Sequence, residues 1–96
     1  MKVGDQFQST NITSQATTVI ATGVGVLHTI TFNKPVATGT VTIYNNTAAS
    51  GTKIGAITVP ASPMPVTLTY DAAFGVGLTI VTGTADQDIT VTWAQG

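Results

Sequence analysis

The stretch Asp88-Ile89-Thr90-Val91-Thr92-Trp93-Ala94, near the end of the chain, decides the fold. Successive side chains of a β-strand point to opposite faces of the sheet. The stretch therefore places two branched apolar residues and the only tryptophan on one face, and two threonines on the other. The same alternation occurs in 66–70 and in 41–43. A chain that repeats this pattern is predicted to build sheets with one apolar face and one threonine-rich face.

Strand patterns recur along the chain, and no window shows sustained helical spacing of apolar residues. Turn-forming residues separate the strands at intervals of roughly 8–12 residues, as in antiparallel sandwiches and barrels. Two packed sheets bury their apolar faces better than one open sheet does. We therefore predict an all-β fold, an antiparallel β-sandwich of about seven to eight strands with jelly-roll or immunoglobulin-like topology. The expected strands are 16–22, 26–33, 40–44, 52–59, 66–70, 77–82 and 88–94.

Two irregularities are expected within these strands. Ile54 and Ile57 do not share the alternation of a regular strand, and Gly55 between them indicates a β-bulge that resets the register. Asp71 is placed to begin a corner over 71–75 through an Asx turn.

The length of 96 residues is that of one domain. Residues 1–15 are polar and carry no apolar stripe, so they are expected to form an N-terminal arm or a loose first edge strand. Residues 16–96 are expected to form the sandwich. The start of the chain lacks the apolar core of a secretory signal, and no stretch approaches the ~20 apolar residues of a membrane span.

Charge is the unusual quantity in the composition. Only 7% of the residues are charged, against about 25% in ordinary soluble domains, and there is no arginine. Binding to nucleic acid or to an anionic membrane needs several basic side chains, so neither partner is expected. The absence of cysteine excludes disulfides and thiolate metal sites. A surface with so few charges gives an isolated chain little protection against association. Part of this surface is therefore expected to be covered by other protein.

Residues for chemistry are sparse. His28 is the only histidine, so any Ser–His pair must use it. Its place on the same predicted strand face as Val26, Ile30 and Phe32 favours a hydrogen-bonded core or interface residue over a catalytic base. Asp86 and Asp88 lie two positions apart, but a calcium site takes about 6–8 oxygen ligands. We therefore expect a protein that is not an enzyme, without catalytic residues, cofactor or metal.

Four blocks of the sequence stand in a distinctive order: GVLHTIT at 25–31, VTIYNNTAASGTKI at 41–54, YDAAFGVGLTIVTG at 70–83 and DITVTW at 88–93. Together they resemble a small family of tailed-bacteriophage virion proteins. The resemblance implies a compact β-fold and a structural role, that of a head decoration or cement protein on the outer capsid surface. The implied partners are the major capsid protein and further copies of the chain, with a homotrimer favoured. The implied location is the virion surface, and the host cytoplasm during assembly.

Other functions stay open beside this one. A tail or fibre module that recognises host-surface glycan would need an exposed aromatic residue flanked by polar side chains, for which Trp93, Tyr44 and Asn45 are candidates, although the alternation places Trp93 inside. An immunoglobulin-like adhesive domain and an enzyme are the remaining alternatives. For an oligomer or capsid interface, the candidate residues are Phe7, His28, Tyr44 and Phe74.

Overall fold

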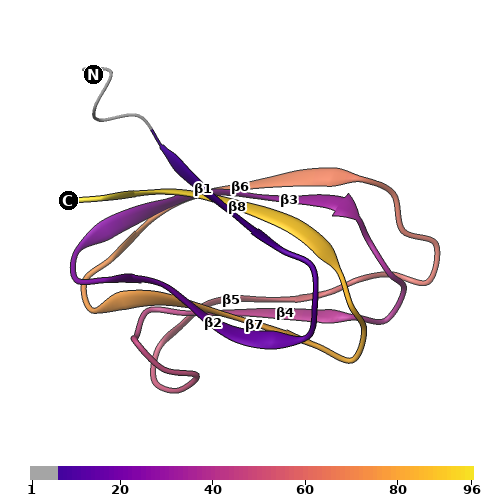
Figure 1. The fold of residues 1–96 in the computed structure, drawn as a ribbon, viewed down its shortest axis with the longest axis horizontal. Coiled ribbons are helices and arrows are strands. Elements are labelled where there is room, and N and C mark those ends of the chain that lie inside the picture. Colours follow the sequence, from indigo (N-terminus) through magenta and orange to yellow (C-terminus); the bar gives the residue numbers. More distant parts are fainter. Residues whose placement is uncertain (1–6) are drawn as a thin grey trace.

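The computed structural model describes residues 7–96, which form two antiparallel four-stranded sheets packed face to face (Figure 1). The predicted all-β sandwich is confirmed. Its eight strands are β1 (Gln8–Ile12), β2 (Ala16–Thr22), β3 (Gly25–Lys34), β4 (Thr40–Tyr44), β5 (Lys53–Thr58), β6 (Val66–Phe74), β7 (Gly77–Gly83) and β8 (Asp88–Gln95).

Strand pairing resolves the topology that the sequence left open. β1 pairs with β8, β2 with β7, β3 with β6 and β4 with β5, as in one long hairpin that has been rolled up. Two further pairings, β3 with β8 and β4 with β7, complete the sheets β1-β8-β3-β6 and β2-β7-β4-β5. This order is a jelly roll. An immunoglobulin-like sandwich relies on hairpins between consecutive strands, and within residues 7–96 only β4 and β5 form one.

The core lies between the two sheets. In β8 the predicted alternation holds, because Ile89, Val91 and Trp93 are all buried. The indole N–H of Trp93 donates to the Thr10 hydroxyl at 3.3 Å, which satisfies its one polar group. The facing sheet contributes buried aliphatic side chains at Ala21, Val41, Ile43, Leu78 and Ile80.

The face predicted for the first half of β3 is wrong. Between Leu27 and Thr29 the register with β8 shifts, so that His28 is an extra residue that has no pairing partner in β8. An extra residue reverses the alternation. Leu27 therefore points into the core together with Ile30 and Phe32, and His28 points outward.

The corner predicted at 71–75 is also wrong, because β6 continues to Phe74. Asp71 takes up a left-handed conformation with φ of 47°, and Tyr70 and Asp71 together oppose the single residue His28. The continued strand carries Phe74 into the core, where it is only 1% exposed. Its predicted interface role is therefore wrong. Gly25 is required beside it, since a Cβ at that position would collide with the Phe74 ring.

The polar segment 1–15 contributes a strand to the sandwich. Gln8–Ile12 pairs in continuous register with Ile89–Trp93, so for these residues the edge-strand alternative is correct. Residues 1–6, the rest of the expected arm, lie outside the described part of the chain.

Three of the four edge strands carry a bulge. In β2 the extra residue is Ile20, in β6 it is Asp71, and in β5 it is Ile54, beside the glycine from which a bulge was predicted. Bulges twist an edge away from the flat geometry that another strand needs for pairing. The edges are thus poorly suited to strand addition.

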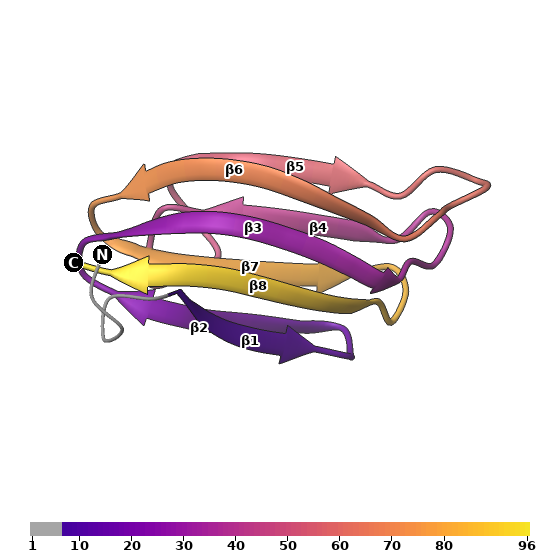
Figure 2. The ribbon, with the colours of Figure 1, turned by 90° about the horizontal axis from the view of Figure 1, so that it is seen from above.

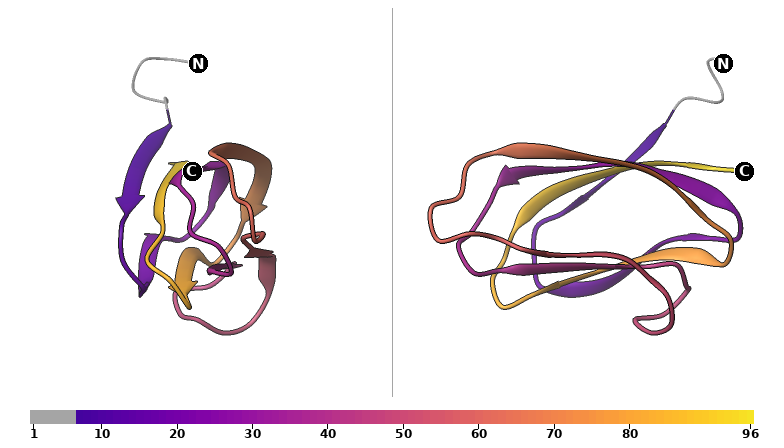
Figure 3. Two further views of the ribbon diagram at one scale, coloured as in Figure 1. Left: turned by 90° about the vertical axis from the view of Figure 1, so that its right-hand side faces the viewer. Right: turned by 180° about the vertical axis from the view of Figure 1, so that it is seen from behind.

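The sandwich has two distinct ends (Figure 2). One, which we call the proline end, carries the β1–β2, β3–β4, β5–β6 and β7–β8 connections. The other, the valine end, carries the β2–β3 and β6–β7 turns, the β4–β5 loop and the C-terminus. The end-on view shows the two sheets as separate layers, and the view from behind shows the connections at the two ends (Figure 3).

Candidate functional site

An apolar groove lies at the proline end, on the side of the sandwich between the edge strands β5 and β6. Prolines 60, 63 and 65 cannot donate to a strand ladder, so the connection between these strands stays outside both sheets. Beneath it remains a cavity of about 190 Å³. The groove is lined by Phe32, Pro35, Ile57, Val59, Pro60, Pro63, Met64, Val66 and Leu68.

The rim of this groove exposes large apolar side chains. Met64, held between two prolines, is 76% exposed, and Val66, which also lines the groove, is exposed as well. Burying such side chains against a partner releases about 25 cal/mol per Å² of apolar surface removed from water. Apolar side chains gathered around a groove mark an interaction surface more clearly than single exposed residues do.

A second apolar feature protrudes from the valine end. Val24 and Val76 occupy the tips of two neighbouring turns and are 62% and 55% exposed. The turns are held together because the Gly23 N–H donates to the Val76 carbonyl at 2.9 Å. Gly23 has φ of 90°, which a glycine adopts without strain. We refer to Val24 and Val76 as the valine knob.

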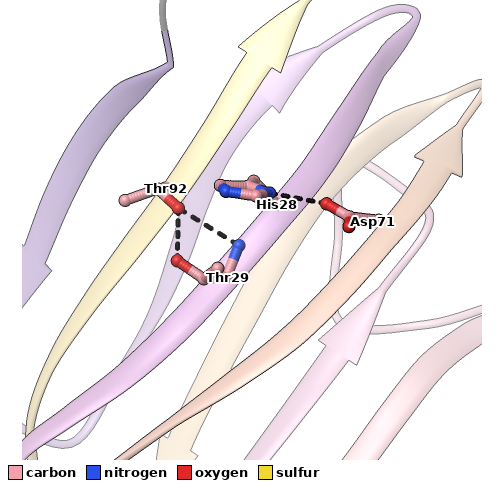
Figure 4. A network of polar contacts seen from close by, with 4 residues as sticks. All are labelled: His28, Thr29, Asp71 and Thr92. Carbon is pink, nitrogen blue, oxygen red and sulfur yellow. Dashed lines mark hydrogen bonds and ion pairs between the residues drawn. The ribbon is translucent and has the colours of Figure 1, made fainter.

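Phe7 and His28, two of the predicted interface residues, meet on the outer face of the β1-β8-β3-β6 sheet. Their rings are stacked with centroids 4.1 Å apart and planes 8° from parallel. The Nδ1 atom of His28 lies 2.5 Å from Oδ1 of Asp71 (Figure 4). The bulges in β3 and β6 turn the imidazole and the carboxylate toward each other on this face.

Two threonines near His28, Thr29 and Thr92, are hydrogen-bonded to each other (Figure 4). The Thr29 and Thr92 hydroxyls are hydrogen-bonded at 2.5 Å, and the Thr29 N–H also donates to the Thr92 hydroxyl (Figure 4). Within residues 7–96, His28 hydrogen-bonds with Asp71 and not with either hydroxyl. A base must lie within hydrogen-bond reach of the hydroxyl it activates. The geometry here ties strands together and does not align a nucleophile with the imidazole.

Asp88 is held on the same outer face by two amides from neighbouring strands. The side-chain N–H groups of Asn11 in β1 and Asn33 in β3 donate to its Oδ1 atom at 2.7 and 3.2 Å. These hydrogen bonds stabilise the carboxylate and lower the pKa of Asp88, and the positive charge of Lys34 acts in the same direction. Asp88 therefore cross-links three strands as a charged group.

The residues considered for glycan binding are not brought together. Trp93 lies in the core of one sheet, while Tyr44 is half-buried in the other. The Asn45 side-chain oxygen accepts hydrogen bonds from the N–H groups of Gly75 and Val76, both at 3.1 Å. Asn45 thus fixes the turn that carries half of the valine knob.

Gln87 is a residue whose importance the sequence did not indicate, because it stands among turn-forming residues. Its side chain is 1% exposed and hydrogen-bonds to both backbone groups of one residue in the β3–β4 connection. Val36 donates its N–H to Oε1 at 2.6 Å, and Nε2 donates to the Val36 carbonyl at 2.8 Å. This clamp fixes Val36, which follows the groove residue Pro35 in the chain.

Among residues 7–96, no three histidine, aspartate or glutamate side chains cluster closely enough to hold a metal ion. The described part of the chain contains no helix long and apolar enough to cross a membrane. Comparison of the chain with known protein families, with characterised proteins and with solved structures gives no match.

Proposed function

We propose that this protein is a structural component of a tailed-bacteriophage particle, a decoration protein that binds the outer capsid surface and stabilises the head. The observation that carries the proposal is the exposure of apolar side chains around the groove and at the valine knob of a sandwich with very few charges. A protein that acts by adding contact area needs surface of this kind and needs no reactive group.

Two further points support the proposal. The four sequence blocks resemble a virion protein family, as described above. Jelly rolls also recur in viral capsid domains, although a fold by itself does not define a function. The major capsid protein is the proposed partner, and the virion surface is the proposed location.

The proposal is tested by adding the purified chain to shells assembled from the major capsid protein encoded in the same genome. We expect co-sedimentation with the shells, added density on their outer surface in electron cryomicroscopy, and a higher temperature of shell disruption. A Met64→Asp variant should bind more weakly, while Val19→Asp, which changes an exposed valine in β2, should bind normally. Shells that stay bare at high micromolar chain concentration, or density confined to the tail, would exclude a decoration role.

A second candidate is a tail or fibre module that binds host glycan. The observation in its favour is the exposed Phe7 ring beside the polar groups of His28 and Asp71. Sugars stack on aromatic rings and bond to neighbouring polar groups, and lectin domains also use jelly rolls. Selective binding on a glycan array that Phe7→Ala abolishes would favour this function, and a blank array would remove it.

A further inference from the structure

We propose that copies of this chain associate head to tail, with the valine knob of one copy seated in the apolar groove of the next. The inference goes beyond the proposed function, because it concerns contacts between copies in the absence of any capsid. Where two copies join, the knob and the groove are buried against each other, so on a shell only the surfaces left at the ends of such an assembly, and the rim of the groove, contact capsid protein.

The two surfaces lie at opposite ends of the molecule. The β5–β6 connection that covers the groove lies at one end of the sandwich, and the two turns that carry the knob lie at the other (Figure 2). One surface is hollow and the other protrudes, so each suits the other better than it suits itself. An interface between two different patches of the same chain is heterologous and repeats from copy to copy.

The size of the groove agrees with side chains as its occupant. A small-molecule site usually measures about 300–1,000 Å³. The groove, at about 190 Å³, is smaller than this but has room for aliphatic side chains. Val24 and Val76 are presented together by turns that a hydrogen bond joins. An apolar anchor that fills a pocket is the usual energetic centre of a protein interface.

The few charges favour the same orientation. At the proline end, Lys34 and Asp88 are opposite each other in the strand register. The exposed Asp86 accepts a hydrogen bond from the Gln15 N–H at 3.0 Å but forms no ion pair within residues 7–96. At the valine end, the exposed Lys53 follows the β4–β5 loop. Head-to-tail contact brings this lysine toward an aspartate. Joining two proline ends would instead bring two aspartates together.

Asp71, the remaining aspartate of residues 7–96, is hydrogen-bonded to His28 on the outer sheet face and belongs to neither end surface. The bulges in three edge strands disfavour association by backbone pairing between sheets. Side-chain contacts at the ends are therefore the favoured mode of association. Repeated head-to-tail contact closes into a ring or extends into a chain.

Cross-linking in trans tests the contact directly, because the chain contains no cysteine. Met64→Cys chains labelled with ¹⁵N are mixed with unlabelled Val76→Cys chains under mild oxidation, and the disulfide-linked products are weighed by mass spectrometry. We expect the mixed product to dominate. Val19→Cys, an exposed position on a sheet face away from both ends, replaces either partner as the control for random collision. A predominance of Met64→Cys homodimers, or a mixed yield no higher than that of the control, would overturn the proposal.

Sedimentation of the uncross-linked chain supplies an independent readout. The average mass should rise with concentration in the micromolar range and fall with Val76→Asp, which we expect to weaken association by at least about tenfold. Lys53→Glu should weaken it by about two- to fivefold, the range of an exposed ion pair. Mixing Lys53→Glu chains with Asp86→Lys chains should strengthen association again. A wild-type chain that stays monomeric at millimolar concentration, or unaffected association in the Val76→Asp variant, contradicts the proposal. Because no capsid is present, failure to bind shells leaves this result standing.

Discussion

Replacing Gln87 tests whether one buried amide holds the proline end together. Gln87→Met retains most of the side-chain volume but removes both hydrogen bonds to Val36, whereas Gln87→Ala also leaves a cavity. Gly39 is part of the same arrangement, since a Cβ at this position would collide with the Gln87 amide. We therefore expect Gly39→Ala to push the amide out of its place.

The magnitude follows from the two bonds. A hydrogen bond contributes about 1 kcal/mol net, and a buried group left without a partner costs about 1–3 kcal/mol. Val36 is partly exposed, so water replaces part of what is lost. We expect Gln87→Met to lower the free energy of unfolding by about 2 kcal/mol and Gln87→Ala by about 3–4 kcal/mol. These losses are large against a total of about 5–15 kcal/mol.

Urea unfolding followed by tryptophan fluorescence measures these values. Gln95→Ala is the matched control, because Gln95 also donates to a backbone carbonyl, that of Thr22, but is exposed, and the loss there should stay below about 1 kcal/mol. Gly39→Ala should cost much less in the Gln87→Ala background than alone, because the colliding amide is absent. Equal losses for Gln87→Met and Gln95→Ala, or additive effects of the Gly39 and Gln87 changes, would refute the reasoning.

Three further predictions concern stability. Phe74→Ala should destabilise by about 3–5 kcal/mol, while Tyr44→Ala, at a half-buried position, should cost about 1–2 kcal/mol in the same urea titration. The pKa of Asp88 is lowered in the folded state, so its stabilising effect is present above the ordinary aspartate pKa of about 3.9 and is lost as the pH falls through the lower folded value. Asp88→Asn should therefore lose less stability than the wild type between about pH 7 and about pH 2.5, and equal losses would contradict this. Thr84 has φ of 69°, an unfavourable value for a β-branched residue. Thr84→Asn should therefore raise the free energy of unfolding by about 0.5–1 kcal/mol in the same titration. A free energy of unfolding that is unchanged or lower would show that the left-handed conformation of Thr84 carries no strain.

The candidate interface residues show where prediction from sequence stopped. Phe7 and His28 do lie together at the surface, while Phe74, drawn from the same reasoning, is buried. In β3 the extra residue His28 exchanges the two faces, so its side chain lies outside. In β6 the side chains of Leu68 and Tyr70 face the core, and because the strand continues past Asp71 with the same alternation, Phe74 faces the core as well. No signal in the sequence around His28 resembles the glycine that marked the bulge in β5.

The threonine–apolar alternation of 88–94 and its repeats sufficed to predict an all-β sandwich, because the two-residue period of a strand is a local property. The same local reasoning located a bulge near Gly55 and buried Trp93. Strand order, the clamp of Gln87 on Val36, and the placement of groove and knob at opposite ends depend on pairing between residues far apart in the chain. Such pairing is decided only when the whole roll closes, since each strand could satisfy its backbone hydrogen bonds with several others and the shared core selects one arrangement.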